Sequence, residues 1–374
     1  MFIGLTVLFS AIIFRLYDLQ IAGHESYRRD RENQSRGWSD QRRPRGTIFD
    51  ARGDALAISV PVSSVAAAPS RIAKPEEAAA ALAPPLGIDK ADLVKLLTKT
   101  RTGPDGQARL SDFVWLRRRV PAEAAAVVKK LGLPGVFLQP EYDRAYPQGK
   151  LLAHVLGLTD IDDRGGDGLE KRLDRSLAGE RTREEIEVDG RRRALSSPEG
   201  LPGGADVHLT IDAQFQRVLE DALDAACAEH RPSWAVAIAI DPRTGAILGL
   251  ANRPSYDPNH PGAGPALRNL AVSSPYEPGS TWKAFTVAGA LEAGVVTPST
   301  VFDCEMGSWK CGARVLHDHD PFGRLSVTNI VVESSNIGAA KIGVKLGPAK
   351  LWKTADAFGF GKKTGVDLPS ESKG

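Results

Sequence analysis

A serine and a lysine with the spacing S-x-x-K stand out at Ser280 and Lys283. Pro278 and Gly279 break the preceding segment, and apolar residues then repeat at helical spacing until Gly294, so we expect a helix that opens at Ser280. One helical turn stacks the lysine amine beside the serine hydroxyl. A hydroxyl becomes a good nucleophile when a base takes its proton, and free N–H groups at a helix start favour developing negative charge. The pair therefore predicts nucleophilic catalysis by Ser280.

The surroundings of the motif matter, because S-x-x-K is short enough to recur by chance. A second copy spans residues 370–373, without an apolar helix behind it. The first copy is followed downstream by a polar triplet, Ser334-Ser335-Asn336, between two apolar segments. S-x-x-K followed by a serine triplet that ends in asparagine is typical of serine enzymes that react with penicillins. Ser334 and Asn336 therefore join the candidate site.

Three segments in order carry a resemblance to one family. They are E-P-G-S-T-W-K at 277–283, S-S-N-I-G at 334–338 and F-G-F-G-K-K-T-G-V-D-L-P at 358–369. Together they resemble the transpeptidase domain of class B penicillin-binding proteins, and three ordered matches are far more specific than one. The resemblance implies an α+β fold, the penicillin-binding transpeptidase fold related to serine β-lactamases, and a serine-type D-Ala-D-Ala transpeptidase.

The family's roles fall on matching positions of this chain. Ser280 would attack the carbonyl between the two terminal D-alanines of a peptidoglycan stem peptide, and an amine of a neighbouring stem would resolve the acyl-enzyme. Lys283 would be the base, which requires its pKa to fall from about 10.4 toward neutrality. Ser334 would relay a proton, and Asn336 would bind the amide backbone of the substrate. β-Lactams would acylate the same serine, and the resemblance implies no cofactor and no metal.

The triplet Lys363-Thr364-Gly365 spells the third motif of this family but does not stand in its place. It lies 27 residues after Asn336, inside a segment that in this family precedes the motif-bearing strand by a long stretch. We therefore expect no catalytic role for the triplet. The strand with the true motif would lie beyond Gly374, so we expect a C-terminally truncated chain with an incomplete transpeptidase domain, which would be inactive alone.

The N-terminal segment is almost wholly apolar from Met1 to Phe14. A membrane span needs about 20 residues, so we expect an uncleaved single-pass anchor over residues 1–22 in the inner or plasma membrane, with the bulk of the chain in the periplasm or outside. A buried core helix is the alternative. Seven arginines between Arg28 and Arg45 follow the apolar run, and by the positive-inside rule they would keep the body cytoplasmic unless a basic tail preceded it.

Residues 23–204 resemble the pedestal, or dimerisation, domain of the same family. The resemblance rests on R-G-T-I-F-D-A-R-G-D-A-L-A at 45–57, on R-A-Y-P-Q-G at 144–149 and on H-V-L-G at 154–157. Local patterns predict a hairpin at 43–57, a strand at 113–116, and helices at 75–82, 90–99 and 122–131. His154 has no nucleophile near it in sequence, so we expect a packed or hydrogen-bonded structural histidine. Charged and then Pro/Gly-rich residues at 181–204 suggest strands that lead into a linker.

Residues 205–374 would be the N-terminal part of the transpeptidase domain. A strand at 207–211 runs into Asp212, which should cap a helix with an apolar face that includes Phe215 and Val218. Apolar runs at 235–240 and 246–251 flank a turn and predict a hairpin, on which the Ser280 helix should pack.

Two further groups of residues could carry chemistry. Cys304 and Cys311 bracket a short loop, which leaves a local disulfide open outside the cytoplasm, whereas Cys227 should be core. The run His317-Asp318-His319-Asp320 invites a metal interpretation. Neighbouring residues of a strand point in alternate directions and converge poorly on one ion, so we expect a polar loop beside the active-site cleft.

The composition narrows the function classes. The chain is 42% hydrophobic and 25% charged, as folded proteins are, and its net charge of +2 is too small to imply a nucleic-acid partner. The family resemblance implies stem peptides, β-lactams and membrane proteins of cell-wall synthesis as partners. The segment I-S-V-P at 58–61 resembles division-type members, so we expect division proteins among these partners. A D,D-carboxypeptidase or β-lactamase-like hydrolase, and a non-catalytic membrane scaffold, are the alternatives.

Overall fold

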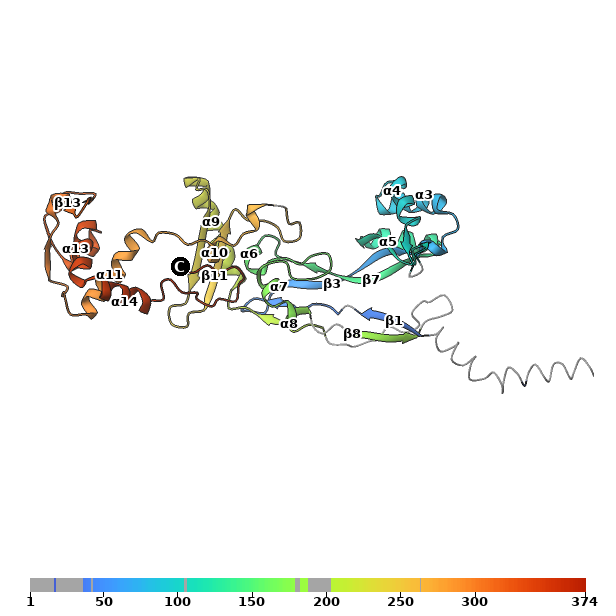
Figure 1. The fold of residues 1–374 in the computed structure, drawn as a ribbon, viewed down its shortest axis with the longest axis horizontal. Helices are drawn as coiled ribbons and strands as arrows, with labels where there is room; N and C mark the ends of the chain where they lie inside the picture. The colour runs from blue at the N-terminus through green and yellow to red at the C-terminus, as the bar shows by residue number, and fades with distance from the viewer. Residues whose placement is uncertain are drawn as a thin grey trace, which may run out of the picture. The chain divides into compact units, whose positions relative to one another are not determined.

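The structure of the chain is a computed structural model. It describes Tyr17 and residues 36–41, 43–103, 106–178, 182–187, 203–262 and 264–374, with the backbone alone at 36–41, 182–187 and Pro265. The chain divides into two compact units, Met1–Leu267 and Arg268–Gly374, whose elements are labelled in Figure 1. The predicted domain boundary at 204/205 lies inside the first unit and remains a prediction.

No helix among the described residues is long and apolar enough to cross a membrane. The predicted anchor at 1–22 lies outside the described residues except for Tyr17. In the segment predicted as strands and a linker at 181–204, residues 182–187 form a strand, and residues 181 and 188–202 lie outside the described residues.

The first unit is built on a five-stranded sheet in the order β6-β3-β2-β9, in which β7 also pairs with β3. Its strands are β2 (Ile48–Phe49), β3 (Ala55–Ala67), β6 (Val114–Val120), β7 (Val136–Ala145) and β9 (Val207–His208). β3 is the central strand, because it pairs antiparallel with β2, β6 and β7. The predicted hairpin at 43–57 is confirmed as β2-β3, and Asp50 closes its turn by accepting the N–H groups of Arg52 and Asp54 at 2.8 Å each.

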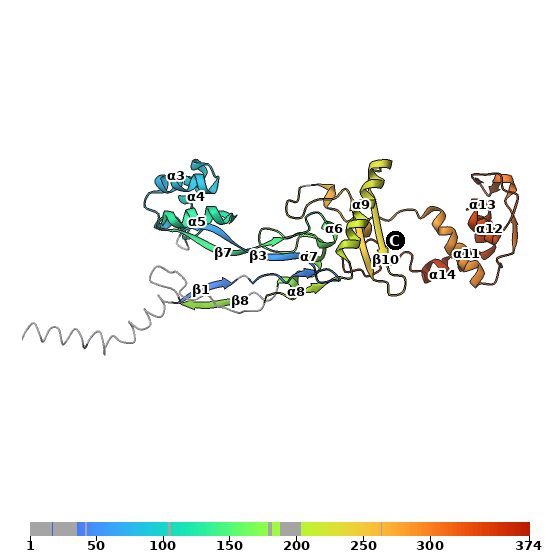
Figure 2. The ribbon, with the colours of Figure 1, turned by 180° about the vertical axis from the view of Figure 1, so that it is seen from behind.

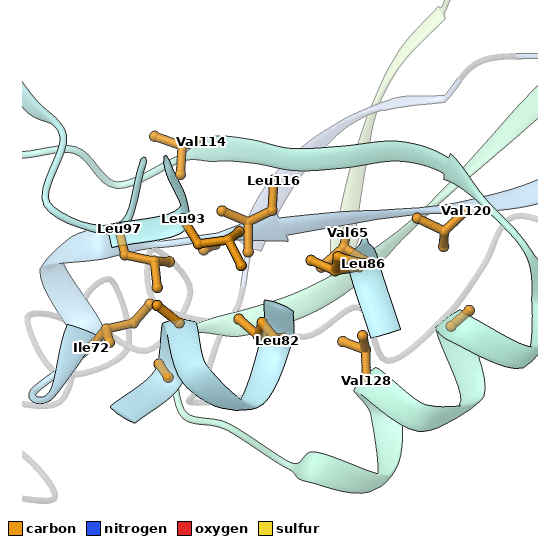
Figure 3. Close-up of a cluster of buried hydrophobic side chains, with 14 residues drawn as sticks. Val65, Ile72, Leu82, Leu86, Leu93, Leu97, Val114, Leu116, Val120 and Val128 are labelled. Carbon is orange, nitrogen blue, oxygen red and sulfur yellow. The ribbon is translucent and has the colours of Figure 1, made fainter. Parts of the chain in front are cut away.

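Three helices pack against β3 and β6 and enclose an apolar core (Figure 3). They are α3 (Pro75–Leu86), α4 (Lys90–Leu97) and α5 (Ala122–Leu131). Leu82, Leu86, Leu93 and Leu97 are fully buried there, and each contributes about 1.5–3 kcal/mol. The predicted helix at 122–131 is confirmed to the residue. Helix α3 continues past its predicted end at residue 82 through Pro84 and Pro85.

The remaining elements of the first unit are short hairpins, strand pairs and helices. The antiparallel pairs are β1 (Arg36–Gln41) with β8 (Thr182–Glu187), β4 (Thr100–Thr102) with β5 (Ala108–Leu110), and β10 (Ala235–Ile240) with β11 (Ile247–Arg253). The helices are η2 (Pro69–Arg71), α6 (Ala153–Leu156), α7 (Gly168–Arg172), α8 (Asp174–Ala178), α9 (Ala213–His230) and η3 (Pro265–Leu267). The hairpin β10-β11 confirms the prediction for that stretch.

Helix α9 begins at its predicted N-cap, Asp212, but it does not bury the predicted apolar face. Phe215 and Val218 are 43% and 66% exposed. Gln216 is buried instead, and its side-chain amide exchanges two hydrogen bonds, of 2.8 and 2.9 Å, with the backbone of Leu250 in β11. A polar anchor therefore sets the orientation of this helix, and the apolar pattern gave no sign of it.

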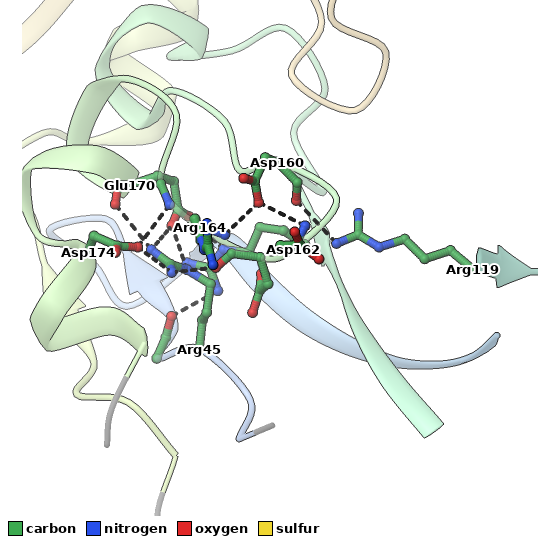
Figure 4. Close-up of polar contacts among 11 residues, drawn as sticks. Arg45, Arg119, Asp160, Asp162, Arg164, Glu170 and Asp174 are labelled. Carbon is green, nitrogen blue, oxygen red and sulfur yellow. Dashed lines mark hydrogen bonds and ion pairs between the residues drawn. The ribbon is translucent and has the colours of Figure 1, made fainter. Parts of the chain in front are cut away.

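A buried ion network explains two of the pedestal segments (Figure 4). Glu170 is fully buried and accepts hydrogen bonds from Arg45 Nε at 2.9 Å and from Arg144 Nε at 2.6 Å. Arg45 also donates to Asp174 at 2.7 Å. These two arginines belong to the family-like segments at 45–57 and 144–149, so those segments serve the scaffold, as expected.

His154 is a structural residue, as predicted. It is buried in α6, its Nε2 donates to the Ala266 carbonyl at 2.7 Å, and its ring meets that of Tyr256 edge-on at 5.2 Å. Burial lowers the pKa of this imidazole, although the hydrogen bond to Ala266 opposes the shift.

The second unit surrounds helix α11 (Trp282–Glu292), and both views label its main helices (Figure 2). The other elements are α10 (Leu270–Ser273), η4 (Gly279–Thr281), β12 (Val301–Asp303), η5 (Glu305–Gly307), β13 (Ser308–Cys311), β14 (Arg314–His317), β15 (Arg324–Ser326), α12 (Val327–Val332), α13 (Asn336–Leu346) and α14 (Pro348–Ala357). β12 pairs with β15 and β13 with β14. The hairpin β10-β11 belongs to the other unit, so the predicted packing of the Ser280 helix on it remains a prediction.

Candidate active site

Ser280 lies in a single 3-10 turn, η4, and the α-helix proper begins two residues later at Trp282. Gly279 precedes it with a φ of +56°, a left-handed conformation that glycine adopts without a Cβ penalty. The Ser280 side chain is exposed, whereas Lys283 is half-buried. The predicted helix start is thus confirmed, with a tighter first turn.

The Lys283 amine meets Ser334. Its Nζ donates to the Ser334 hydroxyl at 3.0 Å and also to the Ser334 carbonyl oxygen. Within the part of the chain that the structure describes, no hydrogen bond links Ser280 to either residue. Catalytic hydrogen bonds are often long before a substrate binds, so the pairing of the Ser280 hydroxyl with the Lys283 amine remains a prediction.

The electrostatics of Lys283 favour its use as a base. Burial lowers the pKa of its amine, because the charged form loses solvation there. The carboxylate of Asp318 acts in the opposite direction and raises that pKa. The balance leaves the pKa below its ordinary value, which is the direction the predicted chemistry needs.

Ser334 occupies the corner between α12 and α13. Its φ is +54°, an uncommon conformation for a residue with a side chain. Backbone hydrogen bonds hold the corner, since the N–H of Ser334 donates to Val331 O at 3.2 Å and that of Ser335 to Ile330 O at 3.0 Å. Gly338 allows the two helices to approach, because a Cβ there would lie 2.5 Å from Ile330 Cγ1.

Asn336 is the first residue of α13, and its side chain is exposed. Its Nδ2 donates to the His317 carbonyl at 2.8 Å. The amide oxygen accepts no hydrogen bond from any described residue, so it can receive an N–H group of a bound peptide. The substrate-binding role expected for Asn336 remains a prediction.

Asp318 is a site residue to which the sequence assigned no role. Its carboxylate lies at the N-terminus of α13, where it accepts the N–H of Ile337 at 3.0 Å and the hydroxyl of Ser335 at 2.7 Å. It also accepts the N–H of Asn336. A negative charge at a helix N-terminus is favourable, so Asp318 and the capping residue Ser335 fix the start of α13 together.

The other residues of the His-Asp-His-Asp run lie at the end of β14 and directly after it. No group of three or more histidine, cysteine, aspartate or glutamate side chains with metal-binding geometry occurs among the described residues. His319 pairs with Asp320 at 3.3 Å and is exposed. Residues 318–320 lie in a loop, as predicted, whereas His317 still belongs to β14.

The triplet at 363–365 lies in an irregular loop. Glu371 closes this loop, since its carboxylate accepts the N–H and hydroxyl of Thr364 at 2.6 and 2.5 Å and the N–H of Gly365 at 3.2 Å. These hydrogen bonds hold the pKa of Glu371 below its usual range, and the largest effect comes from the hydroxyl of Thr364. Glu371 belongs to the second S-x-x-K copy, at 370–373. This copy and the triplet at 363–365 are therefore parts of the same loop.

The F-G-F-G segment packs on the helix that follows Ser280. Phe360 contacts Trp282 and Phe285 with ring centroids 4.6 and 4.9 Å apart, and Phe358 contacts Phe285 at 4.9 Å. Offset and edge-on aromatic pairs of this kind stabilise beyond their buried area. The segment therefore supports α11.

The cysteines are free thiols in the structure, so the disulfide left open for Cys304 and Cys311 is not formed. Cys304 is buried, with its Sγ 3.4 Å from the hydroxyl of Ser335. Cys227 is only half-buried, so it is not the core residue that the helical pattern predicted.

Comparison with known proteins places both parts of the chain. Residues 40–209 match the penicillin-binding protein dimerisation domain, and residues 235–374 match the penicillin-binding protein transpeptidase domain. A probable peptidoglycan D,D-transpeptidase, PenA, of Neisseria meningitidis is 32% identical over 378 residues, which cover 99% of this chain and 64% of the relative.

Two further relatives align over 88% of this chain. They are the stage V sporulation protein D of Bacillus subtilis, at 33% identity over 51% of its length, and the peptidoglycan D,D-transpeptidase FtsI of Escherichia coli, at 32% over 56%. This chain thus spans about half to two thirds of the length of these relatives.

A solved peptidoglycan synthetase from Bifidobacterium adolescentis shares the fold, with a TM-score of 0.64 at 24% identity over 90% of this chain and 66% of that one. The chain therefore belongs to the class B penicillin-binding proteins, whose dimerisation and transpeptidase domains it carries in that order.

Proposed function

We propose that this protein is a peptidoglycan D,D-transpeptidase of cell-wall synthesis that works through an acyl-enzyme on Ser280. One observation carries the proposal. The Lys283 amine, one turn after Ser280, bonds to the Ser334 hydroxyl and has a lowered pKa. The D,D-transpeptidase names of two of the relatives support the same activity.

In the acylation step, the neutral amine of Lys283 takes the proton of Ser280 Oγ while this oxygen attacks the carbonyl between the terminal D-alanines. The backbone N–H of Ser280 stabilises the tetrahedral oxyanion. Ser334, bonded to Lys283, passes the proton to the departing amine. The C–N bond then breaks, D-alanine leaves, and the peptide remains as an ester on Ser280.

In the second step, an amine of a neighbouring stem peptide attacks this ester. The attacking amine loses its proton along the same route, and Ser280 leaves as the free hydroxyl. The new amide is the cross-link. The exposed Asn336 amide holds the peptide backbone of the substrate throughout, because its oxygen accepts no hydrogen bond from a described residue and its Nδ2 is held by the His317 carbonyl.

β-Lactams are expected to acylate the same serine, since their strained amide occupies the place of the D-alanyl-D-alanine bond. Their ester has no amine acceptor in place, so it persists. A penicillin is therefore a direct probe of whether Ser280 is the nucleophile.

The anchor and the surroundings of the protein are part of this proposal. An apolar segment at 1–22 would hold the chain in the membrane, with residues 23–204 as pedestal and 205–374 as transpeptidase domain outside the cytoplasm. Stem peptides are cross-linked there, and membrane proteins of cell-wall synthesis and division would be the partners. Extraction of membranes with alkaline carbonate, followed by protease treatment of spheroplasts, tests both the anchor and the side of the body.

The activity is tested by labelling the full-length protein with a fluorescent penicillin, followed by intact mass and peptide mapping. We expect one label, on Ser280, and none in Ser280→Ala. Product analysis with and without an amine acceptor then separates cross-linking from hydrolysis by a D,D-carboxypeptidase. Absence of label from the wild type, with retained cell-wall function of Ser280→Ala, would show a non-catalytic scaffold.

A further inference from the structure

Three consecutive residues near the active site have left-handed backbone conformations. Glu305, Met306 and Gly307 have φ values of +53°, +49° and +85°. Glycine adopts this conformation freely, but residues with a side chain do so at a cost. Met306 is 67% exposed, so burial does not hold the turn in place. Such strain persists where the surroundings fix it, and it is often found where a functional group must be placed.

An ammonium from helix α13 holds the start of this turn. Lys341 Nζ donates to the Glu305 carboxylate at 2.6 Å and to the Asp303 carbonyl at 2.7 Å. The Lys341 side chain is only 18% exposed, and its Nζ lies 5.1 Å from the ring centroid of Trp309. The Asp303 carboxylate adds a third contact, since it accepts the N–H of Glu305 at 2.8 Å.

Gly307, the last residue of the left-handed turn, is hydrogen-bonded to Asp318. The Gly307 carbonyl accepts the N–H of Asp318 at 3.1 Å. A Cβ on Gly307 would lie 3.0 Å from Asp320 O and 3.1 Å from Pro321 Cα, so the turn packs directly on the loop after Asp318. The Asp318 carboxylate in turn caps the start of α13. Helix α13 is thus held at two places, Lys341 and its N-terminus, by one segment, residues 303–318, which includes the hairpin β13-β14.

We propose that Lys341 and Glu305 are positioning residues of the active site, which act through the left-handed turn and Asp318 on the corner that carries Ser334 and Asn336. Neither residue contacts Ser280 or Lys283 among the described residues. Their effect on acylation rests on the proposed function. Their effect on the start of α13 does not, so the two can be tested apart.

The test uses Lys341→Met in the full-length protein, with Lys345→Met as the matched control. Methionine keeps an apolar stem over Trp309 and removes the ammonium. Lys345 lies one turn further along α13, where its Nζ faces the ring of Phe302 at 5.6 Å, without a described ion pair. Hydrogen–deuterium exchange of peptides over 334–340 reports the helix start, and the second-order rate constant with a fluorescent penicillin reports acylation.

We expect Lys341→Met to speed exchange at 336–338, whose N–H groups bond to Asp318 and Ser335, and to slow acylation about tenfold or more, because small misplacements of reacting groups are costly. Lys345→Met should stay within about twofold of the wild type on the same reasoning. Lys341→Arg, which keeps a donor, should recover most of the rate. Asp318→Asn combined with Lys341→Met should slow acylation less than the product of the single effects, because both act along one path.

Each outcome decides a separate question. Equal exchange and equal acylation in Lys341→Met and Lys345→Met would overturn the inference and leave the proposed function intact. Faster exchange in Lys341→Met with no label on wild-type Ser280 would support the positioning link and overturn the function. Should Lys341→Met not fold, Glu305→Gln replaces it, since this variant removes the carboxylate charge and keeps the contact of Lys341 with Asp303.

Discussion

The ammonium of Lys283 donates hydrogen bonds to both the hydroxyl and the carbonyl oxygen of Ser334, 51 residues further along the chain. The backbone of Ser334 has a φ of +54°. In this conformation both of its oxygens reach the same ammonium. This conformation costs a serine about 1–2 kcal/mol, so the corner between α12 and α13 holds it against a local preference. The proposed base is therefore placed by a second helix as well as by its own.

The pH dependence of acylation should report the lowered pKa of Lys283. Only the neutral amine accepts a proton, so the rate constant should rise with pH through this pKa and then level off. Because Asp318 raises the pKa of Lys283, Asp318→Asn should move the rising limb to lower pH. The measurement is the second-order rate constant with a fluorescent penicillin over about pH 6–10.

The control is Asp320→Asn, which changes a neighbouring carboxylate that does not perturb Lys283. Its rising limb should coincide with that of the wild type. If the acylation rate constant rose over the same pH range in the wild type and in Asp318→Asn, the assignment of Lys283 as the base would be contradicted, whatever the absolute rates.

Asp163 should make the stability of the first unit depend on pH. Burial raises its pKa from 3.8 to about 6, although Arg45 and Arg144 oppose the shift. Its Oδ1 has no hydrogen-bond partner among the described residues. Because the folded pKa is the higher one, the folded state binds more protons between these two values. The contribution of Asp163 to stability is thus full below pH 3.8 and is lost as the pH rises through about 6.

Asp163→Asn should therefore raise the free energy of unfolding at neutral pH, by at most about 3 kcal/mol at 1.36 kcal/mol per pKa unit. Asparagine suits the position, because φ there is +60°. Urea titrations at several pH values measure the effect. The variant should lose most of the slope between pH 4 and 6. Parallel curves for both proteins would show that another group titrates.

The sequence predicted the local features of the candidate site, but not the contacts between segments that lie far apart in the chain. Ser280 and Lys283 lie one turn apart, so a local pattern placed both. Ser334 and Asn336 were recognised by their triplet. The role of Asp318 was missed, because it depends on where the end of β14 meets the N-terminus of α13. No spacing rule links a carboxylate to a helix start 18 residues away.

The same distinction holds for the fold. Helix α5 was predicted to the residue, because Pro121 and Gly132 mark its ends locally and Gly132 takes the left-handed C-cap conformation. Helix α9 was predicted with the correct N-cap, Asp212, but with the wrong buried face. Its orientation depends on the two hydrogen bonds between the side-chain amide of Gln216 and the backbone of Leu250. A polar anchor of this kind appears only when the strand lies beside the helix.

Glu170→Gln should destabilise the first unit strongly. Glu170 is fully buried between Arg45 and Arg144, and the glutamine would leave two guanidinium groups without their shared counter-charge. Breaking a buried ion pair in this way costs about 3–5 kcal/mol. Asp92→Asn is the control, because its pair with Lys95 is exposed and screened by solvent, so its loss should change the stability little. Equal urea midpoints for both variants would mean that the buried network adds no more than a surface pair.

Gly289→Ala should loosen the packing of α11 on α14. A Cβ at this position would lie 2.3 Å from Oγ1 and 2.9 Å from Cγ2 of Thr354, so one helix must shift. Such overpacking costs about 1–3 kcal/mol. Gly343→Ala is the matched control inside α13, because its Cβ would meet Thr286 Cγ2 at 3.6 Å, an ordinary contact. That variant should gain up to about 1 kcal/mol from helix propensity.

Denaturant midpoints of the two alanine variants should therefore move in opposite directions. Thr354→Ala in the Gly289→Ala background removes both clashing atoms, so it should recover most of the lost stability. The second substitution leaves the Gly289→Ala change in place, so it cannot restore the backbone freedom of residue 289. Recovery would therefore show that the lost stability came from the steric clash with Thr354. Since Lys283 lies on α11, the same double variant should also restore any acylation rate that Gly289→Ala loses. A Gly289→Ala variant as stable as Gly343→Ala would show that α11 and α14 can separate at no cost.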